Sequence, residues 1–120
     1  MEIAVLGSLK MELVKNVPTL PRIGETVAGS SFENTPGGKG ANQAVALSRL
    51  GVSVSFVGNV GKDAFGEELT SALLNEGLDL SMLGSVDEKT GTALINVFEN
   101  SDNQIIYVPG ANKSTNYNQV

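Results

Sequence analysis

Apolar residues fall into short runs that are separated by polar and glycine-rich stretches. Residues 3–6 and residues 52–60 form two such runs, typical of strands that are buried on both faces, as in parallel sheets. Between them, residues 41–48 carry small side chains at helical spacing, which predicts a closely packed helix that ends at Gly51. This alternation of strand and helix favours an α/β fold with a mainly parallel sheet.

A second helix is predicted after Asp63. An aspartate at this point is typical of a helix N-cap, an interpretation that we prefer to a catalytic carboxylate. Residues 65–73 supply an apolar face at helical spacing, and Gly77 is expected to end the helix. The last stretch, residues 111–120, is polar and predicts no regular element, and we interpret Asn112 as a turn residue.

Four weaker strand patterns have polar faces and do not fit a buried parallel sheet. Residues 11–17 and 26–32 predict two of them. Residues 91–99 and 103–108 predict a hairpin around the polar tip at residues 100–102. We expect these strands to form a small second sheet, which would act as a flap or lid.

Glycine is the compositional outlier of this chain. The 120 residues, a common size for one domain, include 14 glycines, about 12% against a usual value of about 7%. Six of them lie between Gly24 and Gly51. This clustering indicates special backbone conformations in that region, and makes it the first place to look for function.

Charge and missing residue types exclude several classes of function. The net charge of −5 argues against a nucleic-acid or anionic-membrane partner, because nothing would offset phosphate repulsion. The absence of His and Cys excludes Ser-His-Asp and Cys-His catalysis, Cys/His zinc sites and disulfides. No apolar run approaches the roughly 18 residues of a membrane span, and residues 1–3 do not open a signal peptide. We therefore expect a cytoplasmic protein.

The strongest local motif is Gly-Gly-Lys-Gly-Ala-Asn-Gln at residues 37–43, directly before the first predicted helix. Glycines allow a ligand to approach the backbone closely, and a helix N-terminus offers free N–H groups with a positive dipole end. Lys39 adds a cation and Asn42 an amide, so the loop suits a polyhydroxy compound or an anion. The spacing matches neither a Walker A loop nor a dinucleotide fingerprint. The alternative is a glycine-rich turn that only enters a tightly packed helix.

Lys10 and Glu12 form a second candidate site. They flank Met11, and at strand spacing they share one face just after the first buried strand. Ligands of α/β proteins gather at the carboxyl ends of strands, where a carboxylate can accept hydrogen bonds from sugar hydroxyls. The alternative is a solvated pair that forms a weak surface ion pair.

Together these motifs resemble the ribokinase branch of the PfkB-type carbohydrate kinases. The resemblance runs in order and at family spacing over essentially the whole chain. The matching segments are residues 5–8, 21–27, 36–44, 49–51, 57–66, 90–93 and 108–112. Gly-Gly-Lys-Gly-Ala-Asn-Gln-Ala at residues 37–44, with Gly-Glu-Thr upstream at residues 24–26, is the most specific part.

The resemblance implies a ribokinase-like α/β fold, with a mainly parallel sheet flanked by helices and a small β lid over the sugar. Residues 1–120 would be an incomplete, N-terminal part of that domain, with lid strands at approximately 11–17, 26–35 and 91–109. The lid would also pair with a second subunit to form a homodimer. The residues that inherit a substrate-binding role are Lys10, Met11, Glu12, Gly38, Lys39, Gly40, Ala41 and Asn42. Lys10-Met11-Glu12 stands where the family usually has Asn-x-Asp.

The resemblance also implies an activity for the full-length protein: ATP-dependent phosphorylation of ribose, or a related sugar, at its primary hydroxyl. The family's catalytic Asp lies in a Gly-Ala-Gly-Asp segment that these 120 residues lack. We therefore expect no catalytic, cofactor-binding or metal residue in this chain, and no turnover by the chain alone. ATP, Mg²⁺ and a monovalent cation (K⁺) would bind elsewhere in the protein. The alternative is a non-catalytic fragment that binds sugar or pairs lids.

Overall fold

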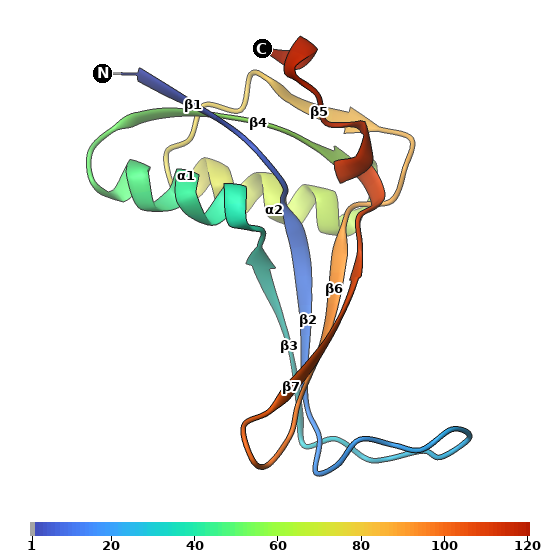
Figure 1. The fold of residues 1–120 in the computed structure, drawn as a ribbon. Coiled ribbons are helices and arrows are strands. Elements are labelled where there is room, and N and C mark those ends of the chain that lie inside the picture. Colours follow the sequence, from blue (N-terminus) through green and yellow to red (C-terminus); the bar gives the residue numbers. More distant parts are fainter. Residues whose placement is uncertain (1) are drawn as a thin grey trace.

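A three-stranded parallel sheet forms the upper layer of the molecule in Figure 1. The computed structural model describes residues 2–120. The strands are β1 (Glu2–Leu6), β4 (Ser53–Gly61) and β5 (Leu83–Val86), in the order β1-β4-β5. The predicted parallel pair of β1 and β4 is confirmed, whereas β5 was missed because its four residues, Leu-Gly-Ser-Val, have no distinctive pattern.

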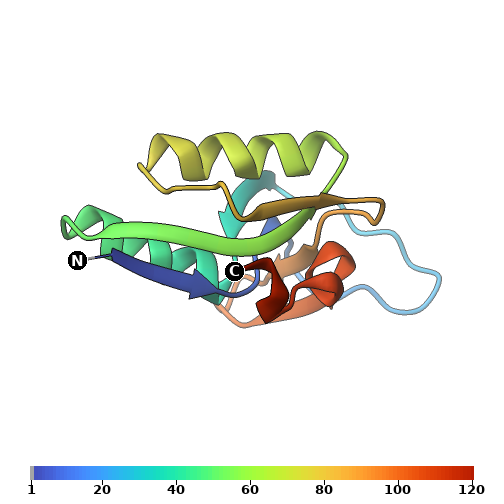
Figure 2. The same ribbon diagram turned by 90° about the horizontal axis from the view of Figure 1, so that it is seen from above.

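Two helices, α1 (Lys39–Arg49) and α2 (Ala64–Asn75), cover one face of this sheet (Figures 1 and 2). The core lies between the sheet and the two helices, around Phe56 of β4 and Leu69 of α2, which are almost fully buried. The predicted close packing of α1 is confirmed, because its Ala44 is fully buried against this core. Neither of these helices is long and apolar enough to cross a membrane, a finding limited to residues 2–120.

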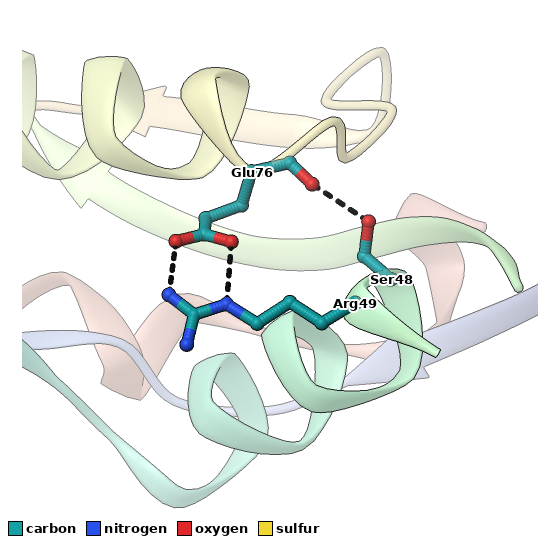
Figure 3. A network of polar contacts seen from close by, with 3 residues as sticks. All are labelled: Ser48, Arg49 and Glu76. Atoms are coloured by element: carbon teal, nitrogen blue, oxygen red, sulfur yellow. Dashed lines mark hydrogen bonds and ion pairs between the residues drawn. The ribbon is translucent and has the colours of Figure 1, made fainter. Parts of the chain in front are cut away.

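The C-terminal ends of the two helices are tied together by a small polar network (Figure 3). Arg49 donates from Nε to the Glu76 carboxylate at 2.8 Å and from Nη2 to its other oxygen, a two-pronged ion pair. Ser48 Oγ donates to the backbone carbonyl of Glu76 at 2.6 Å. The hydrogen bond from Arg49 holds the pKa of the Glu76 carboxyl below its ordinary value. These contacts fix the spacing of α1 and α2 where both helices end.

A second, four-stranded sheet extends downward from the first in Figure 1. Its strands are β2 (Lys10–Asn16), β3 (Ser31–Gly37), β6 (Thr92–Val97) and β7 (Asn103–Val108), in the order β3-β2-β6-β7. The central pair β2–β6 is parallel, and the outer pairs are antiparallel. A separate small sheet and the 92–108 hairpin were both predicted and are both observed.

The prediction for β3 was wrong at both ends. A strand was expected over residues 26–32, but β3 begins at Ser31 and continues through Pro36 to Gly37. Residues 26–30 belong to a long exposed loop that projects from the sheet. Pro36 was read as the start of a loop, yet it is tolerated because β3 is an edge strand, where a missing N–H costs no ladder hydrogen bond.

The C-terminal stretch was also interpreted incorrectly. Instead of lacking any element, it contains two 3₁₀ helices, η1 (Gly110–Ser114) and η2 (Tyr117–Gln119). They pack near the end of β4, where Gln119 Nε2 donates to the carbonyl of Gly58 at 2.9 Å. Short 3₁₀ turns carry too little periodicity for a hydrophobic pattern to reveal them.

Candidate functional site

The glycine loop between β3 and α1 lies directly against the chain that joins β1 to β2. Gly38 is the N-cap residue of α1 and has a φ of 107°, a conformation that strongly favours glycine. A Cβ at Gly38 would lie 2.5 Å from the carbonyl oxygen of Ser8 and 2.8 Å from Cα of Leu9. The loop can therefore sit this close to residues 7–9 only because it carries no side chain at Gly38.

The first turn of α1 makes a second contact with the same segment. The backbone N–H of Ala41 donates to the Ser8 carbonyl at 3.2 Å. Gly40 and Gly7 are also in contact, since a Cβ on either would lie 2.8 Å from Cα of the other. The glycine-rich motif thus packs closely, as the second interpretation of the sequence required, whereas the ligand-binding interpretation stays a prediction. The motif lets the helix pack tightly, and it brings the helix N-terminus to the carboxyl end of β1.

Lys10 and Glu12 lie on one face of β2, as the strand alternation predicted. In the sheet register Lys10 is opposite Gly37, and Glu12 is opposite Thr35 on one side and Ala93 on the other. The Glu12 side chain occupies the space that a Cβ of Gly37 would take. The carboxylate is therefore held beside the glycine loop, one residue before Gly38.

Lys10, Glu12 and Lys39 have no ionic partners among the residues that the structure describes. Lys10 Nζ instead lies 4.9 Å from the ring centre of Tyr107, a cation–π distance. A carboxylate and two lysines are thus available for a polar ligand.

The other predicted site residues differ from these charged residues in burial or in the surface that they line. Met11 points to the opposite face of β2 and packs in the core at 1% exposure, so only its backbone can reach a ligand beside Glu12. Gly40 and Ala41 are buried, and Lys39 is exposed. Asn42 lines a groove of about 540 Å³ between α1 and α2, together with Gly37 at the end of β3.

Asp63 joins the start of α2 to Thr90, two residues before β6. It caps α2, as predicted, by accepting a hydrogen bond from the Gly66 backbone N–H at 2.9 Å. It also accepts from the backbone N–H of Thr90 at 2.9 Å and from Thr90 Oγ1 at 2.6 Å, two bonds that the sequence did not reveal. Burial raises the pKa of the Asp63 carboxyl, but these hydrogen bonds, helped by Lys89, outweigh it, and the net pKa is below the ordinary value.

Asn112 makes long-range contacts that sequence reasoning missed. It does lie in a tight 3₁₀ turn, consistent with the predicted turn, but its side chain bonds to Leu9, 103 positions away in the sequence. The only hint was a polar amide placed directly after a strand and the Pro-Gly-Ala sequence.

The family assignment comes from comparison with known proteins. A profile described as "pfkB family carbohydrate kinase" matches residues 1–119. The chain belongs to this family. The ribokinase of Lactococcus lactis is 46% identical over 112 residues, which are 92% of this chain and 37% of that protein. The ribokinase of Bacillus subtilis is also 46% identical, over 111 residues and 38% of its length.

The fold is likewise that of the family. The structure of Arabidopsis thaliana ribokinase complexed with ribose and ATP superimposes with a TM-score of 0.87 at 36% identity. The match covers 92% of the present chain and 36% of the Arabidopsis chain. The expected ribokinase-like α/β fold is therefore confirmed. The pfkB chain described here spans a little more than a third of the length of these relatives.

The acidic side chains among residues 2–120 do not gather into a metal centre. Within the part of the chain that the structure describes, no three acidic, His or Cys side chains converge in a way that could hold a metal ion. Mg²⁺ is bound through carboxylates and phosphates, and this stretch offers no such carboxylate cluster. What it offers is the glycine loop, Glu12 and two lysines.

Proposed function

We propose that this chain is the sugar-binding and lid portion of an ATP-dependent kinase that phosphorylates ribose, or a related sugar, at its primary hydroxyl. The observation that carries the proposal is the position of the Glu12 carboxylate beside Gly37 and the N-terminus of α1. A carboxylate next to a glycine-rich loop and a helix N-terminus suits a compound with several hydroxyl groups. The pfkB family match, and relatives that are named ribokinase, support the same substrate class.

In this proposal the predicted site residues of the chain bind or orient the sugar. Glu12 accepts hydrogen bonds from sugar hydroxyls, and Lys39 donates to them from the start of α1. Lys10 donates from the same face of β2, and the backbone of residues 38–42 approaches the sugar closely, with the Asn42 amide adding a donor and an acceptor. The β2-β3-β6-β7 sheet covers the sugar and excludes water from it.

The remaining requirements of phosphoryl transfer fall to other parts of the full-length protein. The transfer needs activation of the sugar hydroxyl and stabilisation of charge at the γ-phosphate. The family resemblance assigns these roles to an aspartate in a Gly-Ala-Gly-Asp segment and to ATP, Mg²⁺ and K⁺, with none of their sites in this chain. The cytoplasmic location also stays a prediction.

A second candidate function is a non-catalytic module that binds sugar or pairs lids. It rests on one observation, the glycine loop at residues 37–43, which suits sugar binding whether or not phosphoryl transfer follows. The two candidates differ in turnover. Only the first predicts sugar-dependent ADP formation by the full-length protein.

The test is a coupled assay of ADP formation by the full-length protein with ribose, 2-deoxyribose and other pentoses and hexoses. We expect turnover with at least one pentose. Lys39→Ala and Asn42→Ala should each raise the sugar KM about tenfold, the loss of one hydrogen bond worth about 1.4 kcal/mol. The KM for ATP should not change.

The matched control is Lys62→Ala, which removes an exposed lysine whose ion-pair partner, Asp87, is even more exposed. Its sugar KM should equal that of the unmodified protein. An unchanged sugar KM in both the Lys39 and the Asn42 variants would contradict their assigned role. Absence of turnover with every sugar would contradict the kinase itself and favour the second candidate.

We further propose that the lid pairs with the lid of a second copy. On the face of the lid opposite Glu12, Leu94 and Ile106 are directly paired, and Ile106 is 54% exposed on the edge strand β7. An exposed apolar pair beside an open strand edge suits contact with another copy. Ile106→Lys should therefore shift a dimer towards monomer in sedimentation velocity. Leu50→Lys, an exposed apolar residue after α1, is the control and should leave the dimer intact.

A further inference from the structure

The segment that links β1 to β2 is held from two sides. On one side the glycine loop packs against it, because Gly38 lies against Leu9 and the Ala41 N–H donates to the Ser8 carbonyl. On the other side it contacts the start of η1 through Asn112. Leu9 is fully buried, and Lys10 follows it directly. Any movement of Leu9 is therefore transmitted both to the glycine loop and to the strand that carries Lys10 and Glu12.

Asn112 uses its whole side-chain amide to hold the Leu9 backbone. Its Oδ1 accepts from the Leu9 N–H at 3.0 Å, and its Nδ2 donates to the Leu9 carbonyl at 2.9 Å. Nδ2 also donates to the carbonyl of Pro109 at 2.9 Å, within its own turn. The side chain thus pairs with both backbone groups of Leu9, as a neighbouring β-strand would.

The surrounding backbone is shaped around this amide. A Cβ on Gly91 would collide with Asn112 Nδ2, so the glycine at the root of β6 leaves the space that the amide fills. The Gly91 carbonyl accepts from the N–H of Met11 at 2.9 Å, and Ala111 donates its N–H to the Lys89 carbonyl at 2.7 Å. The roots of β2, β6 and β7 therefore meet at one point, with Asn112 at its centre.

We propose that Asn112 is a positioning residue for the sugar site, acting through Leu9. It holds the Leu9 backbone against Gly38, and so sets the distance between the charged face of β2 and the glycine loop. The inference rests on the proposed sugar-binding role of that loop. Asn112 itself contacts no substrate.

Asn112→Asp is the sharpest substitution because it keeps the size of the side chain and the acceptor for the Leu9 N–H. The NH₂ group that donates to the carbonyls of Leu9 and Pro109 is replaced by a carboxylate oxygen, which can only accept. This oxygen then faces two carbonyl oxygens with no hydrogen atom to form a bond to either, which is repulsive. We expect Leu9 to move away from its present position. Asn116→Asp is the matched control, since within the described residues the Asn116 side-chain amide bonds only to exposed backbone groups two residues away.

The test uses the full-length protein with each substitution and has two independent readouts. In the coupled assay, Asn112→Asp should raise the sugar KM at least tenfold while kcat and the KM for ATP stay within about twofold. By amide hydrogen exchange, protection should fall at the Leu9 N–H and also at the Ala41 N–H, which bonds to Ser8 in the glycine-loop contact. Asn116→Asp should change neither readout.

Each outcome bears on the inference in a defined way. If the sugar KM is unchanged in Asn112→Asp, or rises only in proportion to a fall in kcat, the positioning role is overturned. Loss of protection at Leu9 without loss at Ala41 also overturns it, because the effect then does not reach the glycine loop. Should the unmodified protein turn over no sugar, the proposed kinase function fails, and the exchange experiment alone decides whether Asn112 positions the loop.

Discussion

Replacing Gly38 by alanine should remove measurable sugar affinity and destabilise the protein by roughly 2–4 kcal/mol. Two costs add up at this position. A φ of 107° is strained for any residue with a side chain, at about 1–3 kcal/mol. The new Cβ would also lie 2.5 Å from the Ser8 carbonyl oxygen, a backbone atom that can yield only if the β1–β2 link moves. Such a movement separates the glycine loop from Glu12.

Gly51→Ala separates the two costs. Gly51 also has a positive φ, 89°, but apart from its neighbours in the chain no heavy atom that would contact a Cβ lies within 4 Å. The variant should therefore lose about 1 kcal/mol from backbone strain and keep its sugar KM. Urea denaturation and the coupled assay measure both quantities for both variants. Equal losses of stability and affinity in Gly38→Ala and Gly51→Ala would mean that contact with residues 8–9 does not matter.

Local chemistry made part of this fold predictable from the sequence. Asp63 caps α2, and Gly51 and Gly77 follow the helix ends with positive φ values, because caps and turns depend on residues close in sequence. The shared face of Lys10 and Glu12 follows from strand alternation in the same way.

The errors arose where distant parts of the chain decide the structure. Pro36 reads as a loop residue, and only its place on an edge strand makes it part of β3. Asn112 reads as an ordinary turn residue, because nothing near it in sequence indicates that Leu9 will lie alongside. The burial of Met11, between two half-buried charges, likewise depends on the core that α2 brings to β2.

The second large effect is expected at Asp63, where one carboxylate serves three donors. Asp63→Ala leaves the Gly66 N–H, the Thr90 N–H and the Thr90 hydroxyl without this acceptor, and Thr90 is 3% exposed. Loss of a helix cap costs about 1 kcal/mol, and a buried donor without a partner costs about 1–3 kcal/mol. We therefore expect a loss of roughly 2–4 kcal/mol in urea denaturation at pH 7. Asp87→Ala, which removes an almost fully exposed carboxylate, should lower the free energy of unfolding far less.

Acid should remove the same stabilisation from the unmodified protein. The pKa of Asp63 is lower in the folded than in the unfolded state, because the hydrogen bonds favour the charged form more than burial opposes it. A lowered folded pKa stabilises the fold at pH values above the unfolded pKa of about 3.9, and this contribution is lost as the pH falls towards the folded pKa. Asp63→Asn cannot titrate, so its stability lacks this component at every pH.

The difference in unfolding free energy between the unmodified protein and Asp63→Asn should therefore be constant from pH 7 to about pH 5 and shrink below about pH 4. Asp87→Asn, measured in parallel, controls for the general effect of acid on a protein with 13 acidic residues. A difference that stays constant down to pH 3 would show that the Asp63 charge does not hold the root of β6. Because Thr90 lies two residues before β6, a shrinking difference would show that the Asp63 charge helps to hold the start of β6 against α2.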